Sequence, residues 1–356
     1  MVRNIICIFL VTFLISVIPL LSQDDGVDSI YSIADTLDKD FGLFKYDDIL
    51  DMALWFDITH YTQKKPKEEY LDAILTYYIS DKDSINKNIR LKSRGEFRND
   101  FCSFPPLVLN FKKTDFALED LSKLGKMKMV THCKSGNIGY LFREYLVYRL
   151  YNVLTDYSFR VRLIRITYHN TFKEKKPIQT YGFFIEPIDF LAERLNLIPV
   201  ESVHLSQKNI KPEEMDRMAV FNYMIGNTDW SVPNQHNCKV LAQPGSERPD
   251  LGIIVPYDFD YSGLVNADYA IPYEGLGIES VRQRIYLGLC RSEEEMLKVI
   301  EPFSAKKDEF YKVIQEFDML DERAKSDIIR FLDDFYRLFD EKNRIVKVLL
   351  EECRTY

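Results

Sequence analysis

The sequence lacks long blocks of basic residues, paired metal-binding cysteines and repeats, and each absence excludes a class of protein. Its formal net charge is −8 and its acidic and basic residues are interspersed, so it has no electrostatic footprint for nucleic acid. No cysteine lies in a CxxC motif, and no group of histidines and cysteines has the spacing of a zinc site. Low-complexity segments are also missing. Because 46% of the residues are hydrophobic, most of the chain can contribute to a folded core.

The long apolar run at the N-terminus indicates the compartment. Arg3 precedes an apolar stretch over 5–21, and a polar, acidic segment begins at Ser22. A basic start, an apolar stretch and a small residue before a polar region are typical of a secretory signal. We therefore predict a signal peptide over 1–22 and a polar leader over 23–44. The mature chain would be exported (periplasmic, on the cell surface or secreted) and would have no transmembrane segment after cleavage. The alternative is an uncleaved membrane anchor.

The cysteines outside this apolar stretch are Cys102, Cys133, Cys238, Cys290 and Cys353. An exported protein meets oxidising conditions, so we expect one or two disulfides. Five is an odd number, so at least one thiol stays free or pairs with another chain. The sequence alone leaves the connectivity open.

Short runs in the first half of the chain predict strands, and a change of period marks a helix. The runs that predict strands lie at 52–61, 70–79, 88–92, 107–111, 126–131, 159–168 and 180–186. Between them, Phe142, Leu146 and Leu150 recur at helical spacing and predict a helix over about 138–154. The pattern predicts an α+β lobe with a mostly antiparallel sheet and one inserted helix, over 45–187.

After residue 187 the pattern becomes mainly helical. We predict helices at 190–195 and 212–225, and strands at 238–241 and 253–257. An apolar stripe over 328–339 predicts a packed helical bundle at the C-terminus. The segment 188–356 is therefore expected to form a second, helical lobe.

Polar residues gather at the ends of the two strands in this second lobe. The loop before the first strand carries Asp229 and Asn237, and Asp258 and Asp260 follow the second strand. If the two strands pair as a hairpin, Asn237 and Asp258 lie side by side, with Asp229 just outside them. Such oxygen donors suit Mg²⁺, and phosphoryl transfer needs them. The alternative is that these residues only form turns. Asp258 fits that alternative poorly, because it directly follows an apolar run where an unpaired charge is costly.

The order of these two segments, GNTDWSVPNQHNCKVL and then IIVPYDFDYSG, resembles the paired signature of the CotH-type (spore coat protein H-like) kinase family. Three upstream stretches are also similar to that family: IRLKSRGEFR, GYLFREYLVYRLYNVL and YGFFIEPIDFLAERL. The resemblance covers roughly 52–263 in a consistent order. It implies a two-lobed, atypical protein-kinase-like fold with a mostly antiparallel N-lobe sheet and a helical C-lobe. It also implies ATP-dependent protein phosphorylation.

The resemblance further implies roles for individual residues. Asp229 would be the catalytic base. Asn237 and Asp258 would hold Mg²⁺ or Mn²⁺, with Asp260 in support, and ATP would be the phosphate donor. Asn234 lies five residues after Asp229, which is the ordinary kinase-loop spacing. Asn237 is preferred because it directly precedes the strand.

The nucleotide contacts are less completely defined. Glu186 lies where a contact to the adenine is expected. Glu144, in the helix, is the candidate partner of a phosphate-binding lysine, and the alternative for it is a solvated helix charge. The chain has no GxGxxG loop, and the paired-lysine segment of the family is replaced by FPP at 104–106. The candidate phosphate-binding cations are therefore Arg94, Lys112 and Lys92.

These observations predict an exported, Mg²⁺-dependent, nucleotide-binding phosphotransferase that acts on a protein or other exported acceptor. ATP supply outside the cytoplasm is a difficulty for this hypothesis. The second hypothesis is therefore a catalytically inactive kinase-like binding module at the cell surface or in the periplasm. The third is a metal-dependent hydrolase that uses the same acids with water as acceptor.

Overall fold

The computed structural model describes residues 42–45, 47–78, 84–111, 125–201, 204–245, 251–340 and 344–355. The predicted signal peptide (1–22), the predicted leader up to residue 41, and Lys112 lie outside these ranges. Within the ranges described, no helix is both long enough and apolar enough to cross a membrane.

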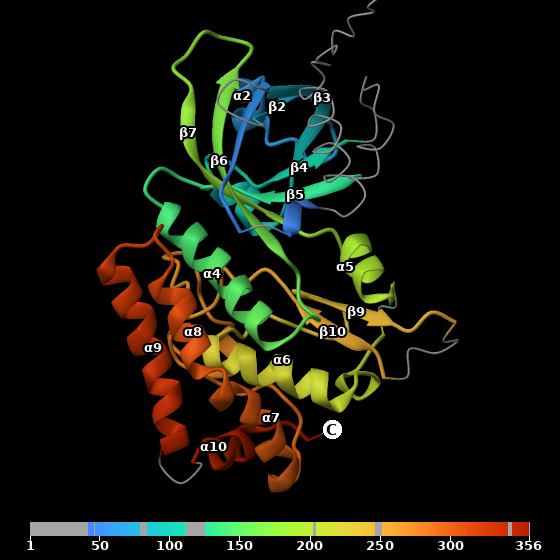
Figure 1. Cartoon of the computed structure of the whole chain (residues 1–356), viewed down its shortest axis with the longest axis vertical. Helices are drawn as coiled ribbons and strands as arrows, with labels where there is room; N and C mark the ends of the chain where they lie inside the picture. The colour runs from blue at the N-terminus through green and yellow to red at the C-terminus, as the bar shows by residue number, and fades with distance from the viewer. Residues whose placement is uncertain are drawn as a thin grey trace, which may run out of the picture.

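Seven strands in the first part of this chain close into a barrel (Figure 1). They are β1 (Leu50–Phe56), β2 (Leu71–Tyr78), β3 (Ser84–Ser93), β4 (Leu107–Asn110), β5 (Lys126–Val130), β6 (Val161–Asn170) and β7 (Ile178–Ile185). Their order around the barrel is β1-β2-β3-β4-β5-β7-β6. The β1–β6 pair is parallel and closes the barrel, while the other neighbours are antiparallel. Apolar side chains such as Leu54, Leu91 and Met129 fill one buried core cluster.

The barrel shows that the predicted fold class is wrong. A two-lobed, kinase-like fold with a mostly antiparallel N-lobe sheet requires an open sheet, whereas here β1 and β6 join the sheet edges. Closure depends on parallel pairing between residues far apart in the sequence, such as Leu54 and Tyr168. Local alternation of apolar and polar residues reports which face of a strand is buried, but it does not report which strand lies beside it. The sequence pattern therefore located the strands but not their closure.

Short helices connect the strands of the barrel. Helix α2 (Ile58–Lys64) begins where Asp57 accepts a hydrogen bond from the backbone N–H of His60 at 2.8 Å. It replaces the second half of the strand predicted at 52–61. Helix α3 (Phe97–Phe101) lies between β3 and β4. A short 3₁₀ turn, η1 (Gly42–Phe44), precedes β1.

Helix α4 (Ile138–Leu154) lies between the barrel and the helical part of the molecule (Figure 1). Its bounds and those of α6 (Pro212–Ile225) agree with the sequence-based prediction. Tyr148 of α4 packs edge-on against Phe183 of β7, and Tyr151 packs against Phe221 of α6. Because α4 is covered on both sides, its buried residues extend around most of its surface.

The remaining elements form a small sheet and a group of helices below the barrel (Figure 1). The sheet has the order β10-β9-β8. Its strands are β8 (Ile198–Pro199), β9 (Cys238–Ala242) and β10 (Ile253–Pro256). The helices are α5 (Ile188–Leu195), η3 (Gln207–Asn209), η4 (Glu274–Leu276), α7 (Glu293–Ala305), α8 (Lys307–Gln315), α9 (Glu322–Asp340) and α10 (Arg344–Glu352). The predicted helical C-terminus is confirmed.

Two disulfides link distant parts of the described chain. Cys102 pairs with Cys133, and Cys290 pairs with Cys353. Cys238 is free and buried. The expectation of one or two disulfides with a thiol left over is therefore confirmed.

Candidate functional site

The β9–β10 hairpin brings Asn237 and Asp258 to the same end of two buried strands. Cys238 pairs with Pro256, and the backbone N–H of Tyr257 donates to the carbonyl of Asn237 at 3.0 Å. Asn237 directly precedes β9, and Asp258 follows β10 by two positions. The predicted hairpin is therefore confirmed, and it places the two side chains at one edge of the sheet.

Both residues have a left-handed backbone conformation. The φ angles are 51° at Asn237 and 61° at Asp258, a region that asparagine and aspartate tolerate better than most residues. The N–H of Asp258 donates to the hydroxyl oxygen of Tyr148 at 2.8 Å, so helix α4 fixes this turn. Uncommon backbone conformations that neighbouring groups hold in place are found most often at functional sites.

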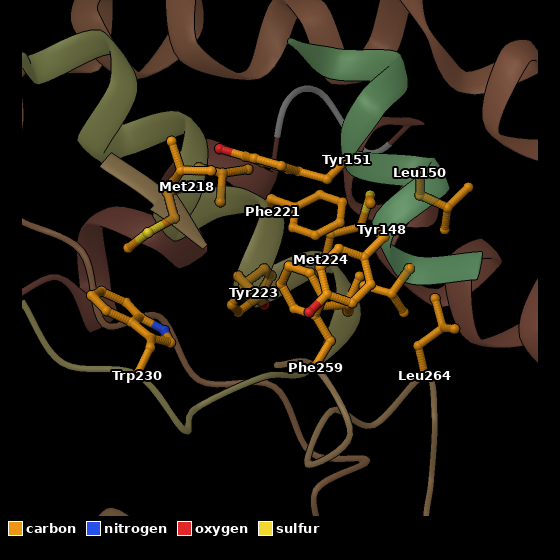
Figure 2. Packing of buried hydrophobic residues seen from close by; sticks show 14 of the residues in the cluster. Tyr148, Leu150, Tyr151, Met218, Phe221, Tyr223, Met224, Trp230, Phe259 and Leu264 are labelled. Atoms are coloured by element: carbon orange, nitrogen blue, oxygen red, sulfur yellow. The ribbon is translucent and has the colours of Figure 1, made fainter. Parts of the chain in front are cut away.

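Phe259 anchors the segment that carries the two aspartates. Its side chain is fully buried and lies between Tyr148 of α4 and Phe221 of α6, with ring centroids 4.8 and 6.0 Å away (Figure 2). The side chain of Phe259 is held in the core, whereas its two neighbours in the chain, Asp258 and Asp260, line a pocket. Burial of one aromatic ring thus fixes the position of two carboxylates.

This pocket has a volume of about 400 Å³. It lies between the 94–98 segment, which follows β3, and the ends of the β9–β10 hairpin. The charged and amide side chains that line it include Arg94, Arg98, Asp229, Asn237, Asp258 and Asp260. The structure therefore brings together the predicted base, the three predicted metal ligands and one of the candidate phosphate-binding cations.

Two neighbouring side chains hold the Asp229 carboxylate in place. Its Oδ2 accepts a hydrogen bond from Nδ2 of Asn237 at 2.8 Å, and its Oδ1 lies 2.9 Å from Nε2 of His236. The same Asn237 nitrogen also donates to the backbone carbonyl of Asp229 at 2.8 Å. The Asp229 side chain is 37% exposed. A carboxylate that is both oriented and accessible is suited to accept a proton from a ligand.

Oxygen atoms suited to a divalent cation remain available in the pocket. Because Nδ2 of Asn237 donates to Asp229, the Oδ1 of Asn237 is left without a hydrogen-bond partner among the described residues. Asp258 makes one long ion pair, in which its Oδ1 lies 3.6 Å from Nη2 of Arg98. Carboxylate and amide oxygens are the ligands that Mg²⁺ prefers, so these residues fit a magnesium site.

Arg98 is the centre of an ionic cluster in the wall of the pocket. Its Nη2 lies 2.6 Å from Oε2 of Glu144, and its Nε lies 2.7 Å from Oδ2 of Asp260. One oxygen each from Glu144, Asp258 and Asp260 lies within 4.8 Å of the others, a spacing that could hold a metal ion. The Arg98 guanidinium already contacts all three carboxylates. The predicted metal-supporting Asp260 is thus held by an arginine, and Glu144 pairs with that arginine rather than with a lysine.

The environment shifts the titration of these acids. Burial raises the pKa of Glu144 to about 8, against the lowering effect of Arg98 and with a further rise from Asp260. Burial likewise raises the pKa of Asp260, while Arg98 lowers it. Burial opposes the charge of Arg98, but Asp260 and Glu144 hold its pKa well above the ordinary value. Arg98 therefore stays charged, and the pKa of Glu144 lies near neutral pH.

Cations from the barrel and from the small sheet lie near Tyr257 and Asp258. Within the described ranges, the Arg94 side chain forms no hydrogen bond or ion pair, and it faces the pocket. Lys128 of β5 places its Nζ 5.0 Å from the ring centroid of Tyr257, and Lys239 of β9 places its Nζ 5.9 Å from the same centroid. Burial, with a further contribution from Arg94, lowers the pKa of Lys128 to about 8, although water reaches its side chain. These groups could bind an anion beside Asp258.

Other residues singled out from the sequence lie elsewhere. Glu186 does not line the pocket; it is buried and receives hydrogen bonds from Nε and Nη2 of Arg194 at 3.0 and 2.9 Å. Lys92 lies with its Nζ 5.2 Å from the Tyr70 ring centroid, and it does not line the pocket either. Asn234 accepts a hydrogen bond from the backbone N–H of His236. Lys112 lies outside the described residues.

Sequence reasoning missed Arg98 and Lys128. Arg98 stands in the quoted RGEFR motif, but its partners Glu144 and Asp260 follow it by 46 and 162 positions. The alternation in KMKMV over 126–130 indicates that Lys126 and Lys128 share the outer face of their strand. It does not indicate that this face lies beside Asp258.

Comparison with protein-family models and with curated proteins finds no match for this chain. Any functional conclusion therefore depends on the geometry of the pocket and on the chemistry of its residues.

Proposed function

We propose that the protein is an exported, divalent-cation-dependent phosphotransferase that moves a phosphate from ATP to a protein or other exported acceptor. The observation that carries the proposal is the convergence of Asp229, Asn237 and Asp258 on one accessible pocket. These residues come from two segments of the chain, and a proton acceptor beside oxygen ligands for a metal is the arrangement that phosphoryl transfer requires. The resemblance of the two segments to the CotH-type family favours the same reaction.

In this proposal Asp229 acts on the acceptor. Its carboxylate accepts the proton of the acceptor hydroxyl while the acceptor oxygen bonds to the terminal phosphorus of ATP and the bond to the ADP oxygen breaks. Asn237 and His236 orient the carboxylate for this step. A general base positioned in this way contributes about 10²–10⁴-fold to rate.

The phosphates of ATP would lie between Asp258 and the cations of the barrel. Asn237 and Asp258 would hold Mg²⁺ or Mn²⁺, which when bound neutralises phosphate oxygens. Arg94 has a guanidinium without partners among the described residues, and guanidinium groups bind phosphate through two parallel hydrogen bonds. Lys128 supplies a further positive charge beside Tyr257.

Export is part of the proposal. It is supported by the apolar N-terminal stretch of the sequence and by the two disulfides, because such cross-links persist mainly in oxidising compartments. An exported acceptor is the corresponding expectation for the substrate.

One observation favours a second candidate, a catalytically inactive binding module. The Arg98 guanidinium lies among Glu144, Asp258 and Asp260, where it already compensates their charge. A fixed guanidinium reduces the attraction of these acids for a metal ion. In such a module the same pocket would bind an anionic ligand without transferring phosphate.

Replacement of the proposed base tests the leading candidate. In Asp229→Asn the hydrogen bonds to Asn237 and His236 can largely persist, but proton acceptance is lost. We expect transfer of labelled phosphate from ATP to casein, used as a generic acceptor, to fall at least about 100-fold, while ATP affinity changes less than about threefold. The matched control is Asp268→Asn, which removes the same charge from an exposed residue outside the pocket.

The two candidates predict different results for the folded wild-type protein. Transfer at the same rate in Asp229→Asn and wild type contradicts the assignment of the base. The binding module is favoured if ATP binds but no phosphate is transferred to casein or to the protein itself, and no free phosphate is released.

A further inference from the structure

A second cavity of the described chain lies away from the candidate pocket. It has a volume of about 900 Å³. Its walls are helix α2, the 103–104 segment, the loop over 132–136 that leads into α4, and the start of β7. None of these walls contains a residue to which the proposed phosphotransferase function assigns a role. We call this cavity the β7 groove.

One wall of the β7 groove is an unpaired strand edge. Strand β6 pairs with β7 over its whole length, from Ile178 to Ile185, but β5 pairs with β7 only from Phe183 onward. Among the described residues, no strand or isolated bridge pairs with the opposite edge over 178–182. Figure 1 shows this part of β7 at the margin of the barrel, above the first turn of α4. Alternate residues here direct N–H and C=O groups away from β6.

The charge of the β7 groove is positive. Lys134, Lys175 and Lys176 line it, and no aspartate or glutamate of the described chain does. None of the three lysines forms an ion pair with a described residue. The Nζ of Lys134 lies 3.2 Å from the ring centroid of Phe101, a contact that leaves its charge uncompensated. Three unpaired cations in one groove attract an anionic partner.

The other polar groups of the groove suit a peptide. Ser135, Gln179 and Gln63 line the groove, and within the described ranges their side chains have no hydrogen-bond partner. Burial lowers the pKa of His132 to about 4, so this ring is a neutral part of the wall. Neutral hydroxyl and amide groups can pair with the backbone of a ligand while the lysines contact its acidic side chains.

We propose that the β7 groove binds an extended acidic peptide segment of a partner protein, which adds as a strand to the free edge of β7. Main-chain hydrogen bonds to residues 178–182 supply the affinity that does not depend on sequence, as in other cases of strand addition. Lys134, Lys175 and Lys176 select carboxylate side chains on the bound strand. This binding does not depend on the proposed phosphotransferase activity, because the groove and the pocket have separate walls.

The proposal is tested with a fluorescein-labelled, ten-residue peptide that alternates glutamate with valine and threonine. Two control peptides carry glutamine in place of glutamate, or N-methyl groups on alternate backbone amides. We expect fluorescence anisotropy at low salt to show that the acidic peptide binds at least about tenfold more tightly than either control. Among residues 178–182, hydrogen exchange should slow in the complex at the amides that point away from β6, because these amides gain partners.

A triple variant separates the lysines of the groove from the rest of the surface. Lys134→Gln/Lys175→Gln/Lys176→Gln should weaken binding of the acidic peptide by about tenfold or more, since exposed ion pairs contribute small but additive terms. The matched control, Lys298→Gln/Lys312→Gln/Lys347→Gln, removes the same charge from α7, α8 and α10 and should bind as wild type does.

Three results would overturn the proposal. They are equal binding of the glutamate and glutamine peptides, equal binding of the N-methylated peptide, and unchanged binding by the groove variant. If no peptide binds at millimolar concentration, the proposal is also wrong. Lys175, Lys176 and Pro177 then serve only to protect an exposed strand edge from association.

Discussion

Arg98 compensates part of the negative charge in the candidate pocket. Glu144, Asp258 and Asp260 surround this one guanidinium. Burial raises the pKa of Glu144 to about 8, so at pH 7 this acid is mostly protonated. Protonation of Glu144 removes one negative charge from the surroundings of Arg98. Asp258, the most exposed of the three acids, is the one that remains available to a metal ion.

Lys128 gives the pocket a predicted pH dependence. Its pKa is lowered to about 8, so the free protein carries this charge below pH 8 and loses it above. An anion near Lys128 favours the charged form, so anion affinity should fall as the pH rises from 7 to 9.5. In Lys128→Arg the charge persists throughout this range, and the fall should largely disappear.

Calorimetric titration with ATP at several pH values measures how the affinity changes with pH. Glu144 also ionises in this range, and it does so in both proteins, so the difference between wild type and Lys128→Arg isolates the lysine. The same decrease in affinity in both proteins would show that Lys128 is not near the bound anion.

At the scale of elements, two glycines bring the segments of the pocket together. The N–H of Gly263 donates to the carbonyl of Gly226 at 3.0 Å, so the turn after Asp260 lies against the end of α6. A Cβ atom on Gly263 would lie 2.3 Å from the carbonyl oxygen of Val281, which is too close for any real contact. The backbone approach that positions Asp229 and Asp260 therefore requires glycine here.

Gly263→Ala should consequently lower the free energy of unfolding by about 1–3 kcal/mol, because backbone atoms must move to relieve the overlap. Urea denaturation measures the change. The matched control is Gly139→Ala in the first turn of α4, where an added Cβ meets no atom within 4 Å. Alanine favours helix there, so the control should be neutral or slightly stabilising. Equal stability of Gly263→Ala and wild type would show that the two segments do not depend on this close approach.

Some elements of this fold could be predicted from the sequence and others could not, for a physical reason. Helices α4 and α6 and the hairpin ends at Asn237 and Asp258 were predictable, because period and neighbouring residues determine them. The parallel β1–β6 pair was not, because it joins strands separated by most of the barrel sequence. The same limit applies to Arg98, whose two strongest partners lie on α4 and after β10. Local patterns determine elements and their ends, while contacts between elements depend on packing.

At the scale of the whole molecule, the two disulfides add covalent links between segments that otherwise only pack against each other. Cys102–Cys133 links the end of α3 to the loop before α4, and Cys290–Cys353 links the segment before α7 to the C-terminal end of α10. The first lies close in sequence to Arg98 and to Lys134 of the β7 groove.

The disulfides span 31 and 63 residues, and in the chain-entropy model each stabilises the fold by about 4 kcal/mol. Reductant should therefore lower the midpoint of urea denaturation markedly. Cys290→Ser/Cys353→Ser should lose part of this response, whereas Cys238→Ala, which removes the free thiol, should keep all of it. An unchanged midpoint, in protein whose disulfides mass spectrometry shows to be reduced, would contradict this expectation.

The most direct test of the proposed site is calorimetric titration of ATP into the folded protein with Mg²⁺ or with a chelator, in wild type and in Asp258→Asn. Asparagine tolerates the left-handed backbone at this position, so the substitution removes the charge without disturbing the turn. We predict that wild type binds ATP at least about tenfold more tightly with Mg²⁺ than with the chelator, and that Asp258→Asn loses this difference. Absence of ATP binding, or an affinity that neither Mg²⁺ nor the substitution changes, would contradict a divalent cation at Asp258.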